Sequence, residues 1–185
     1  DIVLRLVTAQ VRVEPSGHEF FVEGSDNLLD AALRAGLAPA YGCSDASCGL
    51  CKARVVSGRI KTTRAASFAL SAAERAHGDA LLCCHTAVTD LVIAAPETES
   101  ASDIPPQVIA AHAERLERQG ETLLLHVKTP AAQRLRFLAG QRVTLELGDG
   151  QRAVQAVASC PCEDRHLEFH IQRRPADEFS THAFE

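Results

Sequence analysis

Apolar and polar residues alternate over residues 10–22, QVRVEPSGHEFFV, on both sides of a Pro-Ser-Gly turn signal. This period-two pattern predicts a β-hairpin. In residues 25–36, SDNLLDAALRAG, the apolar positions instead fall on one helical face. We therefore expect an α-helix there, with Ser25 or Asp26 as its N-cap and Gly36 as its stop.

The rest of the first half contains shorter segments with similar signals. KARVVS at 52–57 and DLVIAA at 90–95 predict strands. SAAERAH at 71–77 predicts a short helix, because Ser71 and Glu74 have the spacing of a capping box. Sheet and helix are therefore mixed in this part of the chain.

Residues 98–106 are acidic, rich in Pro and Ser and without periodicity. We expect them to link a domain at 1–97 to a domain at 107–185. The second domain has strand-like patterns in QVIAAHAERL, ETLLLHVKT, QRVTLELGDGQRAVQAVAS and HLEFHIQR. This spacing predicts a small antiparallel barrel or sandwich, and the fold class expected for the whole chain is α+β.

Composition narrows the kinds of partner. The chain has 185 residues and a net charge of −5, with no basic tract that would favour nucleic acid. No apolar run approaches the roughly 18 residues of a membrane span, and the N-terminus has no signal-peptide layout. We therefore expect a soluble, cytoplasmic protein with protein partners.

The last residues, FSTHAFE, resemble the first turn of a helix with Ser180 as its N-cap. A helix rarely ends a domain after one turn. The chain also contains no methionine. These features predict that the native protein continues beyond Glu185 and that the second domain is incomplete at its C-terminus.

Three of the seven cysteines have the spacing C-x4-C-x2-C, in AYGCSDASCGLCKA. Cys43, Cys48 and Cys51 are separated mostly by small residues, which let backbone N–H groups approach the sulfur atoms of a cluster. Thiolates are soft ligands for iron–sulfur clusters and zinc, and four complete either kind of site. The fourth must come from Cys83, Cys84, Cys160 or Cys162.

The spacing discriminates between the metals. C-x4-C-x2-C with one distant cysteine is typical of plant-type [2Fe-2S] sites, whereas zinc sites more commonly use two short-spaced pairs. A structural zinc site is the alternative. The cysteines are clustered and odd in number, which argues against a disulfide framework and favours a metal centre in a reducing compartment.

Residues 10–97 resemble a plant-type ferredoxin domain, in the order of the hairpin, the helix, the cysteine loop, LLCCHT and DLVIAA. In that family the last ligand lies in a Leu-x-Cys context, which here selects Cys84, two residues after Leu82. Adjacent side chains of an extended chain point in opposite directions, so Cys83 is expected to be a small core residue. The resemblance thus implies a [2Fe-2S] cluster on Cys43, Cys48, Cys51 and Cys84.

Residues 107–185 resemble the first part of the FAD-binding barrel of ferredoxin-reductase-type enzymes, in RFLAGQRVTLEL and LEFHIQRRPADEFSTHAF. Bacterial reductases of multicomponent oxygenases join a ferredoxin domain to such a barrel and then to a nicotinamide-binding domain. In that family an Arg-x-Tyr-Ser pattern contacts the flavin. The aligned residues of this chain are Ala153, Val154, Gln155 and Ala156.

The pyrophosphate loop of that family also differs here. Its Gly-Gly-x-x-Ser pattern becomes Ala176-Asp177 followed by Ser180, so a carboxylate stands where phosphate would bind. Arg152 is one residue out of place, which puts it on the opposite face of its strand. We therefore expect the barrel to have lost FAD binding, and no Gly-rich segment for a nicotinamide is found.

The segment SCPC at 159–162 stands apart from these motifs. Cys160 and Cys162 could bind a metal or form a redox pair, but with proline between them and no further ligands nearby we expect a surface turn. The motifs together predict a one-electron carrier with protein donors and acceptors and an architectural barrel. The alternatives are the N-terminal part of an NAD(P)H-dependent FAD/[2Fe-2S] reductase and a zinc-based interaction module.

Overall fold

The alternating segment at the start of the chain forms a hairpin. The computed structural model describes residues 8–98, 100–163 and 165–185, so the first seven residues of the domain expected at 1–97 lie outside it. Strands β1 (Thr8–Glu14) and β2 (Glu19–Glu23) pair antiparallel, and alternate residues of each are buried. The turn between them contains Gly17 at a φ of 77°, which glycine adopts without strain.

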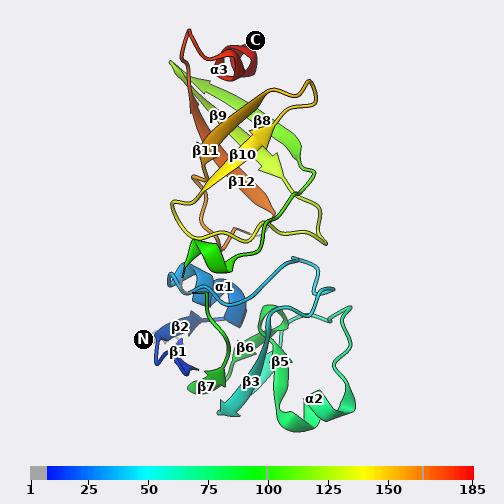
Figure 1. Cartoon of the computed structure of the whole chain (residues 1–185). Helices are drawn as coiled ribbons and strands as arrows, with labels where there is room; N and C mark the ends of the chain where they lie inside the picture. Colours follow the sequence, from blue (N-terminus) through cyan, green and yellow to red (C-terminus); the bar gives the residue numbers. More distant parts are fainter. Residues whose placement is uncertain (1–7, 99, 164) are drawn as a thin grey trace, which may run out of the picture.

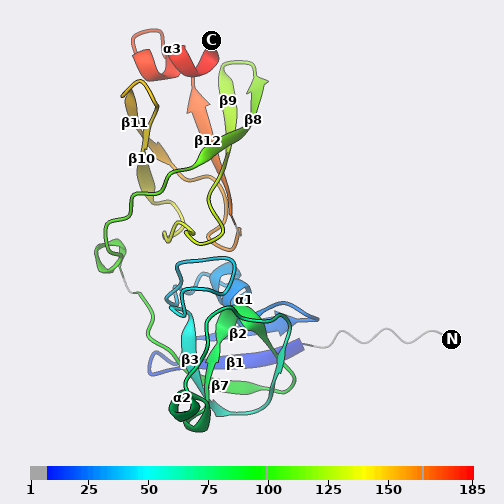
Figure 2. The same ribbon diagram turned by 90° about the vertical axis from the view of Figure 1, so that its right-hand side faces the viewer.

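The hairpin belongs to a five-stranded sheet. Its strands, in order, are β2, β1, β7 (Leu91–Ala94), β3 (Lys52–Ser57) and β5 (Asp79–Leu81). β1 and β7 are parallel and the other neighbours are antiparallel. Helix α1 (Leu28–Arg34) packs its buried leucines against this sheet, and Figures 1 and 2 show it on the side that faces the second half.

The N-cap of α1 differs from the expectation. Asn27 caps the helix, and its side-chain oxygen accepts a hydrogen bond from the backbone N–H of Asp30 at 2.9 Å. Asp26, one of the two residues expected there, pairs instead with Arg34. Asparagine is as good an N-cap as serine or aspartate, so propensity alone could not choose among three adjacent candidates.

Short elements complete the first half. Helix α2 (Ala72–His77) has the predicted capping box, with both the Ser71 and the Glu74 side chains bonded to backbone N–H groups. Strands β4 (Ile60–Thr62) and β6 (His85–Ala87) form a separate two-stranded ribbon. Between β5 and β6 the chain makes one turn of 3₁₀ helix, η1 (Leu82–Cys84). This turn carries two of the cysteines.

The second half consists of two antiparallel sheets around its own apolar core. One contains β12 (His166–Gln172), β9 (Thr122–Lys128) and β8 (His112–Gln119), and the other β10 (Arg142–Glu146) and β11 (Arg152–Ala156). Between the halves lies a 3₁₀ turn, η2 (Ala101–Asp103). Buried side chains from both sheets and from α3 (Glu178–Phe184) meet in one cluster. The sheet-dominated α+β fold predicted from the sequence is confirmed.

The C-terminal helix begins earlier than expected. Asp177, not Ser180, precedes α3 as its N-cap residue. Ser180 lies inside the helix with no exposed surface, and its hydroxyl bonds the backbone of Arg174 and the carbonyl of Asp177. Among the helices of the described residues, none is both long and apolar enough to cross a membrane.

The two halves meet at a buried arginine. The guanidinium of Arg134, 5% exposed, lies 3.2 Å from the Asp30 carboxylate of α1 and 4.9 Å above the centre of the Tyr41 ring. It also donates to the carbonyl oxygen of Pro161 at 2.9 Å. The Arg134 backbone N–H donates to the carbonyl of Gly42 at 2.8 Å. One residue of the second half therefore joins α1 and the start of the cysteine loop.

Replacing Arg134 with methionine keeps an unbranched side chain but removes the charge. We expect the free energy of unfolding, measured by urea titration with circular dichroism, to fall by about 2 kcal/mol, because Asp30 loses its partner and the Pro161 carbonyl loses a donor. The matched control is Arg152→Met, at an exposed pair with Glu146. Surface pairs contribute little, so it should change the same quantity by less than about 0.5 kcal/mol. Equal losses in the two variants would contradict the role of Arg134.

Candidate metal centre

The three closely spaced cysteines lie on the loop that precedes β3. Cys43 and Cys51 are buried and Cys48 is half-buried. The backbone N–H of Cys48 donates to the sulfur of Cys43 at 3.4 Å, and the N–H of Leu50 donates to the sulfur of Cys48 at 3.4 Å. Amides directed at sulfur stabilise thiolates and tune the potential of a cluster that they hold.

Two glycines in this loop lie close to neighbouring side chains, and at Gly49 the backbone conformation also favours glycine. A Cβ on Gly49 would lie 2.6 Å from the ring of Phe68, and the φ of Gly49 is 71°. A Cβ on Gly42 would lie 2.6 Å from a methyl carbon of Leu50 and 3.7 Å from the sulfur of Cys48. The loop is therefore as tightly wound around its sulfur atoms as its small residues predict.

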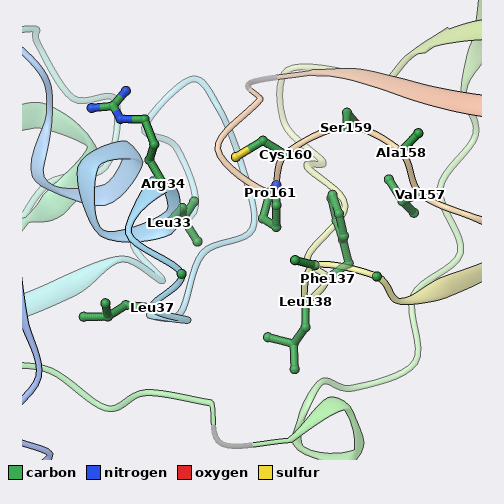
Figure 3. Close-up of a pocket in the computed structure, with 13 residues that line it drawn as sticks. Leu33, Arg34, Leu37, Phe137, Leu138, Val157, Ala158, Ser159, Cys160 and Pro161 are labelled. Atoms are coloured by element: carbon green, nitrogen blue, oxygen red, sulfur yellow. The ribbon is translucent and has the colours of Figure 1, made fainter.

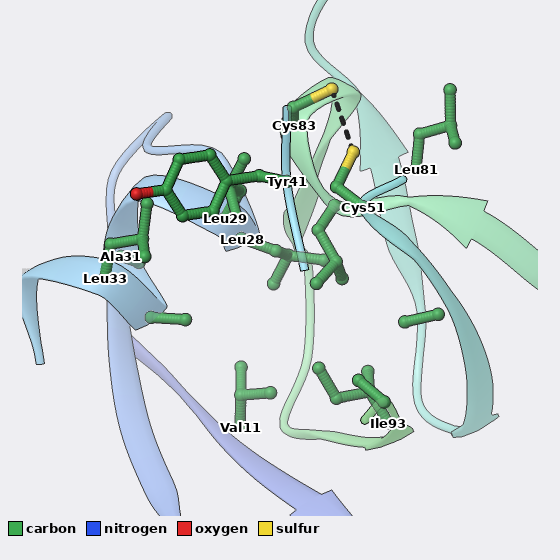
Figure 4. Close-up of a cluster of buried hydrophobic side chains, with 14 of the residues drawn as sticks. Val11, Leu28, Leu29, Ala31, Leu33, Tyr41, Cys51, Leu81, Cys83 and Ile93 are labelled. Carbon is green, nitrogen blue, oxygen red and sulfur yellow. Dashed lines mark hydrogen bonds between the residues drawn. The ribbon is translucent and has the colours of Figure 1, made fainter. Parts of the chain in front are cut away.

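Strand pairing brings a distant cysteine to this loop. In the antiparallel pair of β3 and β5, Lys52 lies opposite Leu81, and the N–H of Leu82 donates to the carbonyl of Cys51 at 2.9 Å. The next residue, Cys83, then meets Cys51: the Cys51 thiol donates to the Cys83 sulfur at 3.3 Å (Figure 4). This contact joins cysteines 32 positions apart in the sequence.

Cys84 occupies a different position from the one that an extended chain would give it. Because Leu82–Cys84 is a 3₁₀ turn, the sulfur atoms of Cys83 and Cys84 lie 3.6 Å apart and both side chains are buried. The premise that adjacent residues here point in opposite directions is therefore wrong. Among the described contacts, Cys83 meets a loop cysteine and Cys84 meets Cys83.

The two remaining candidates lie elsewhere. Cys160 and Cys162 are joined to each other by a disulfide in the second half. Their sulfur atoms are not thiolates in this form and do not ligate a metal. The structure thus gathers five free cysteines of the first half, Cys43, Cys48, Cys51, Cys83 and Cys84.

One arginine beside these cysteines was not identified from the sequence. Arg64 donates from Nη1 to the carbonyl of Ser44 at 2.7 Å and from Nε to the carbonyl of Cys83 at 3.1 Å. Its guanidinium thereby ties the cysteine loop to the 3₁₀ turn. Arg64 lies in the irregular run TTRAAS, where neither periodicity nor motif distinguishes it from a surface arginine.

The thiols of this group have unequal proton affinities. The hydrogen bond from Cys51 and, to a smaller extent, the guanidinium of Arg64 together lower the pKa of Cys83 to about 5, against the opposing effect of burial. The same bond raises the pKa of Cys51, and burial adds to that rise. Burial and, next, the charge of neighbouring Cys83 together raise the pKa of Cys84 to about 11. Of Cys51, Cys83 and Cys84, Cys83 is therefore the one that most readily becomes a thiolate, the form that binds metals.

The donor set fits an iron–sulfur cluster. Cys43, Cys48, Cys51 and Cys83 could supply four soft thiolate ligands, with backbone N–H groups directed at two of the sulfur atoms. No three His, Cys, Asp or Glu side chains of the described residues are grouped as ligands of a single metal ion.

The residues compared with the flavin-binding pattern lie on β11. Arg152 is exposed and pairs with Glu146 at 3.0 Å, whereas Ala153 packs against the core, so the two occupy opposite faces of the strand. Val154 is 53% exposed on the same face as Arg152. At the other candidate position, Asp177 stands at the N-terminus of α3. Of these side chains only Arg152 is a cation, and it is exposed beside Glu146.

Comparison with known proteins identifies the first half. Residues 11–89 match the family model of the 2Fe-2S iron-sulfur cluster binding domain. The chain is 29% identical over 179 residues to the CDP-6-deoxy-L-threo-D-glycero-4-hexulose-3-dehydrase reductase of Yersinia pseudotuberculosis, covering 96% of this chain and 54% of that protein. These two comparisons extend the similarity from the cysteine loop into the second half.

Two further relatives are components of oxygenase systems or related enzymes. The reductase component of phenol 2-monooxygenase from a Pseudomonas species is 32% identical, over 88% of this chain and 46% of that protein. The reductase subunit of an aromatic O-demethylase from an Amycolatopsis species is 33% identical, over 88% of this chain and 49% of that protein. The chain thus spans about half the length of the curated relatives it matches. Residues 11–89 thus match the 2Fe-2S iron-sulfur cluster binding domain, and the chain as a whole is similar to reductases and reductase components over about half of their length.

Proposed function

We propose that the ferredoxin half holds a [2Fe-2S] cluster on Cys43, Cys48, Cys51 and Cys83 and relays electrons between protein partners. Such a cluster accepts and releases one electron at a time. The observation that carries the ligand assignment is the 3.3 Å contact between the sulfur atoms of Cys51 and Cys83. It favours Cys83 over Cys84, the ligand expected from the Leu-x-Cys context.

The protein's own contribution is to hold and insulate the ligands. The N–H groups of Cys48 and Leu50 direct positive dipoles at ligand sulfurs, and Arg64 adds a full charge near Cys83. Burial of Cys43 and Cys51 keeps water from their sulfurs. Leu50 is 55% exposed beside half-buried Cys48, so a protein partner can approach the site most closely at this edge of the loop.

The reductase-type half is proposed to orient the ferredoxin half without binding flavin. The aligned positions Ala153 to Ala156 carry no arginine, tyrosine or serine for a flavin, and Asp177 places a carboxylate at the N-terminus of α3. Arg134 instead docks this half onto α1 and the cysteine loop. In this proposal the donor and acceptor are other protein chains.

A second candidate is a flavin-dependent reductase of which this chain is a part. The observation that favours it is that all three relatives described above are named as reductases or reductase components. The chain spans about half of each of them. Under this candidate the second half would hold FAD through backbone groups, despite the lost side chains.

The metal and flavin content of the purified protein separates these candidates. We expect about two irons and two acid-labile sulfides per chain, with no flavin released on denaturation. Plasma mass spectrometry measures the metal content, and the fluorescence of the supernatant after denaturation measures the flavin content. One FAD per chain would favour the reductase. Zinc in place of iron would contradict both electron-transfer proposals.

The ligand assignment is tested by two adjacent substitutions that are matched in chemistry. We expect Cys83→Ser to abolish the visible charge-transfer absorption or reduce it severalfold, because a weaker oxygen ligand replaces a thiolate. Cys84→Ser, at a buried position of the same turn, should leave the spectrum and the iron content close to those of the unsubstituted protein. The reverse pattern would restore Cys84 as the ligand, and loss of the cluster in both variants would contradict the proposal.

A further inference from the structure

The disulfide between Cys160 and Cys162 belongs to neither proposed function. It closes the loop Cys-Pro-Cys in the second half, and both cysteines are half-buried rather than enclosed. A disulfide stabilises a protein mainly by restricting the unfolded chain, and this restriction falls as the closed loop becomes shorter. A disulfide that closes a loop of three residues therefore adds little to the stability of the fold. Stabilisation alone does not explain why these two cysteines are joined.

Cys160 lines a cavity between the two halves. The cavity has a volume of about 420 Å³ and is bounded by the end of α1 and by the segments 137–140 and 157–161. Figure 3 shows Cys160 and Pro161 on one side of it, opposite Leu33 and Arg34 of α1. Cys160 is half-buried at the wall of this cavity, the side from which an attacking thiol would approach its sulfur.

The same short loop holds the halves together. The carbonyl of Pro161, between the two cysteines, accepts the hydrogen bond from Arg134, whose guanidinium also pairs with Asp30 of α1. Cys162 packs against the apolar core of the ferredoxin half. A change in the conformation of this loop thus acts directly on contacts between the halves.

We propose that Cys160 and Cys162 form a thiol–disulfide exchange site whose substrate is a dithiol, and that its redox state sets how tightly the two halves dock. A thiolate of the dithiol attacks the sulfur of Cys160, the Cys160–Cys162 bond breaks, and Cys162 leaves as a thiolate and takes up a proton. The second thiol of the dithiol then attacks the mixed disulfide and releases Cys160. The protein disulfide gains two electrons and two protons, and the dithiol loses the same number to become a disulfide.

Reduction removes the covalent link that holds Pro161 and Cys162 in place. The loop then gains conformational freedom, and the ordered contacts from its carbonyl to Arg134 and from Cys162 to the ferredoxin core weaken. The inference concerns the contact between the halves and does not rest on the identity of the metal or of the fourth ligand.

The experiment equilibrates the purified holoprotein with mixtures of reduced and oxidised dithiothreitol. Alkylation followed by peptide mass spectrometry measures the reduced fraction of Cys160 and Cys162, and hydrogen exchange measures the backbone amides that bond across the interface. These amides are Ser44, Arg134 and Phe137. We expect one two-electron transition, with the interface amides exchanging about tenfold faster in the reduced protein, the change expected when about one hydrogen bond is lost from a local opening equilibrium.

The matched control is the double variant Cys160→Ser/Cys162→Ser. In this variant the interface amides should exchange at the rate of the reduced protein at every dithiothreitol ratio. Visible absorption monitors the cluster in parallel, so that an effect of dithiothreitol on the cluster cysteines can be told apart from an effect on this site. Amides within β1 should be unchanged throughout. The inference is overturned if both thiols stay free under oxidising conditions, if the interface amides exchange equally in the two redox states, or if the double variant still responds to the dithiol.

Discussion

The antiparallel pairing of β3 with β5 is the constraint on which the rest of the metal centre depends. Lys52 lies opposite Leu81, and the residues just outside the paired strands, Cys51 and Cys83, are brought into sulfur–sulfur contact. A shift of one residue in a β-pair reverses which face each side chain occupies, so the contact exists in this register and in no neighbouring one. The apolar core fixes the register, because Ala53 and its directly opposite partner Ala80 are both buried on one face of the sheet.

Much of this arrangement was predictable because its signals are local. The hairpin, the capping box of α2 and the loop of small residues around Cys43, Cys48 and Cys51 each occupy a short stretch in which spacing reports geometry directly. The choice between Cys83 and Cys84, by contrast, could not be made from the spacing of residues in a short stretch. It depended on the backbone being extended, and the chain instead turns through a 3₁₀ helix at that point. Composition does not reveal such a turn.

The structural roles of Arg64 and Arg134 could not be predicted from the sequence either. Arg64 acts by donating to carbonyls from two segments, and Arg134 acts across the boundary between the halves. Their partners are backbone oxygens, a ring and one carboxylate that become neighbours in the folded chain. A lone arginine is usually a solvated surface residue, and nothing in the order of residues marks the exceptions.

Arg134 also bears on what the second half does. A guanidinium that is 5% exposed loses most of its hydration, and it is stabilised when its charge and its donors are matched in one particular geometry. The Asp30 carboxylate, the Tyr41 ring and the Pro161 carbonyl satisfy that geometry together. A flexible tether between two independent domains would have no need of such a contact, because it permits many orientations. The buried arginine selects one orientation, and electron transfer is a process in which a fixed separation between centres matters. In the function proposed above, the second half therefore serves the first by fixing its position, whether or not it carries a cofactor of its own.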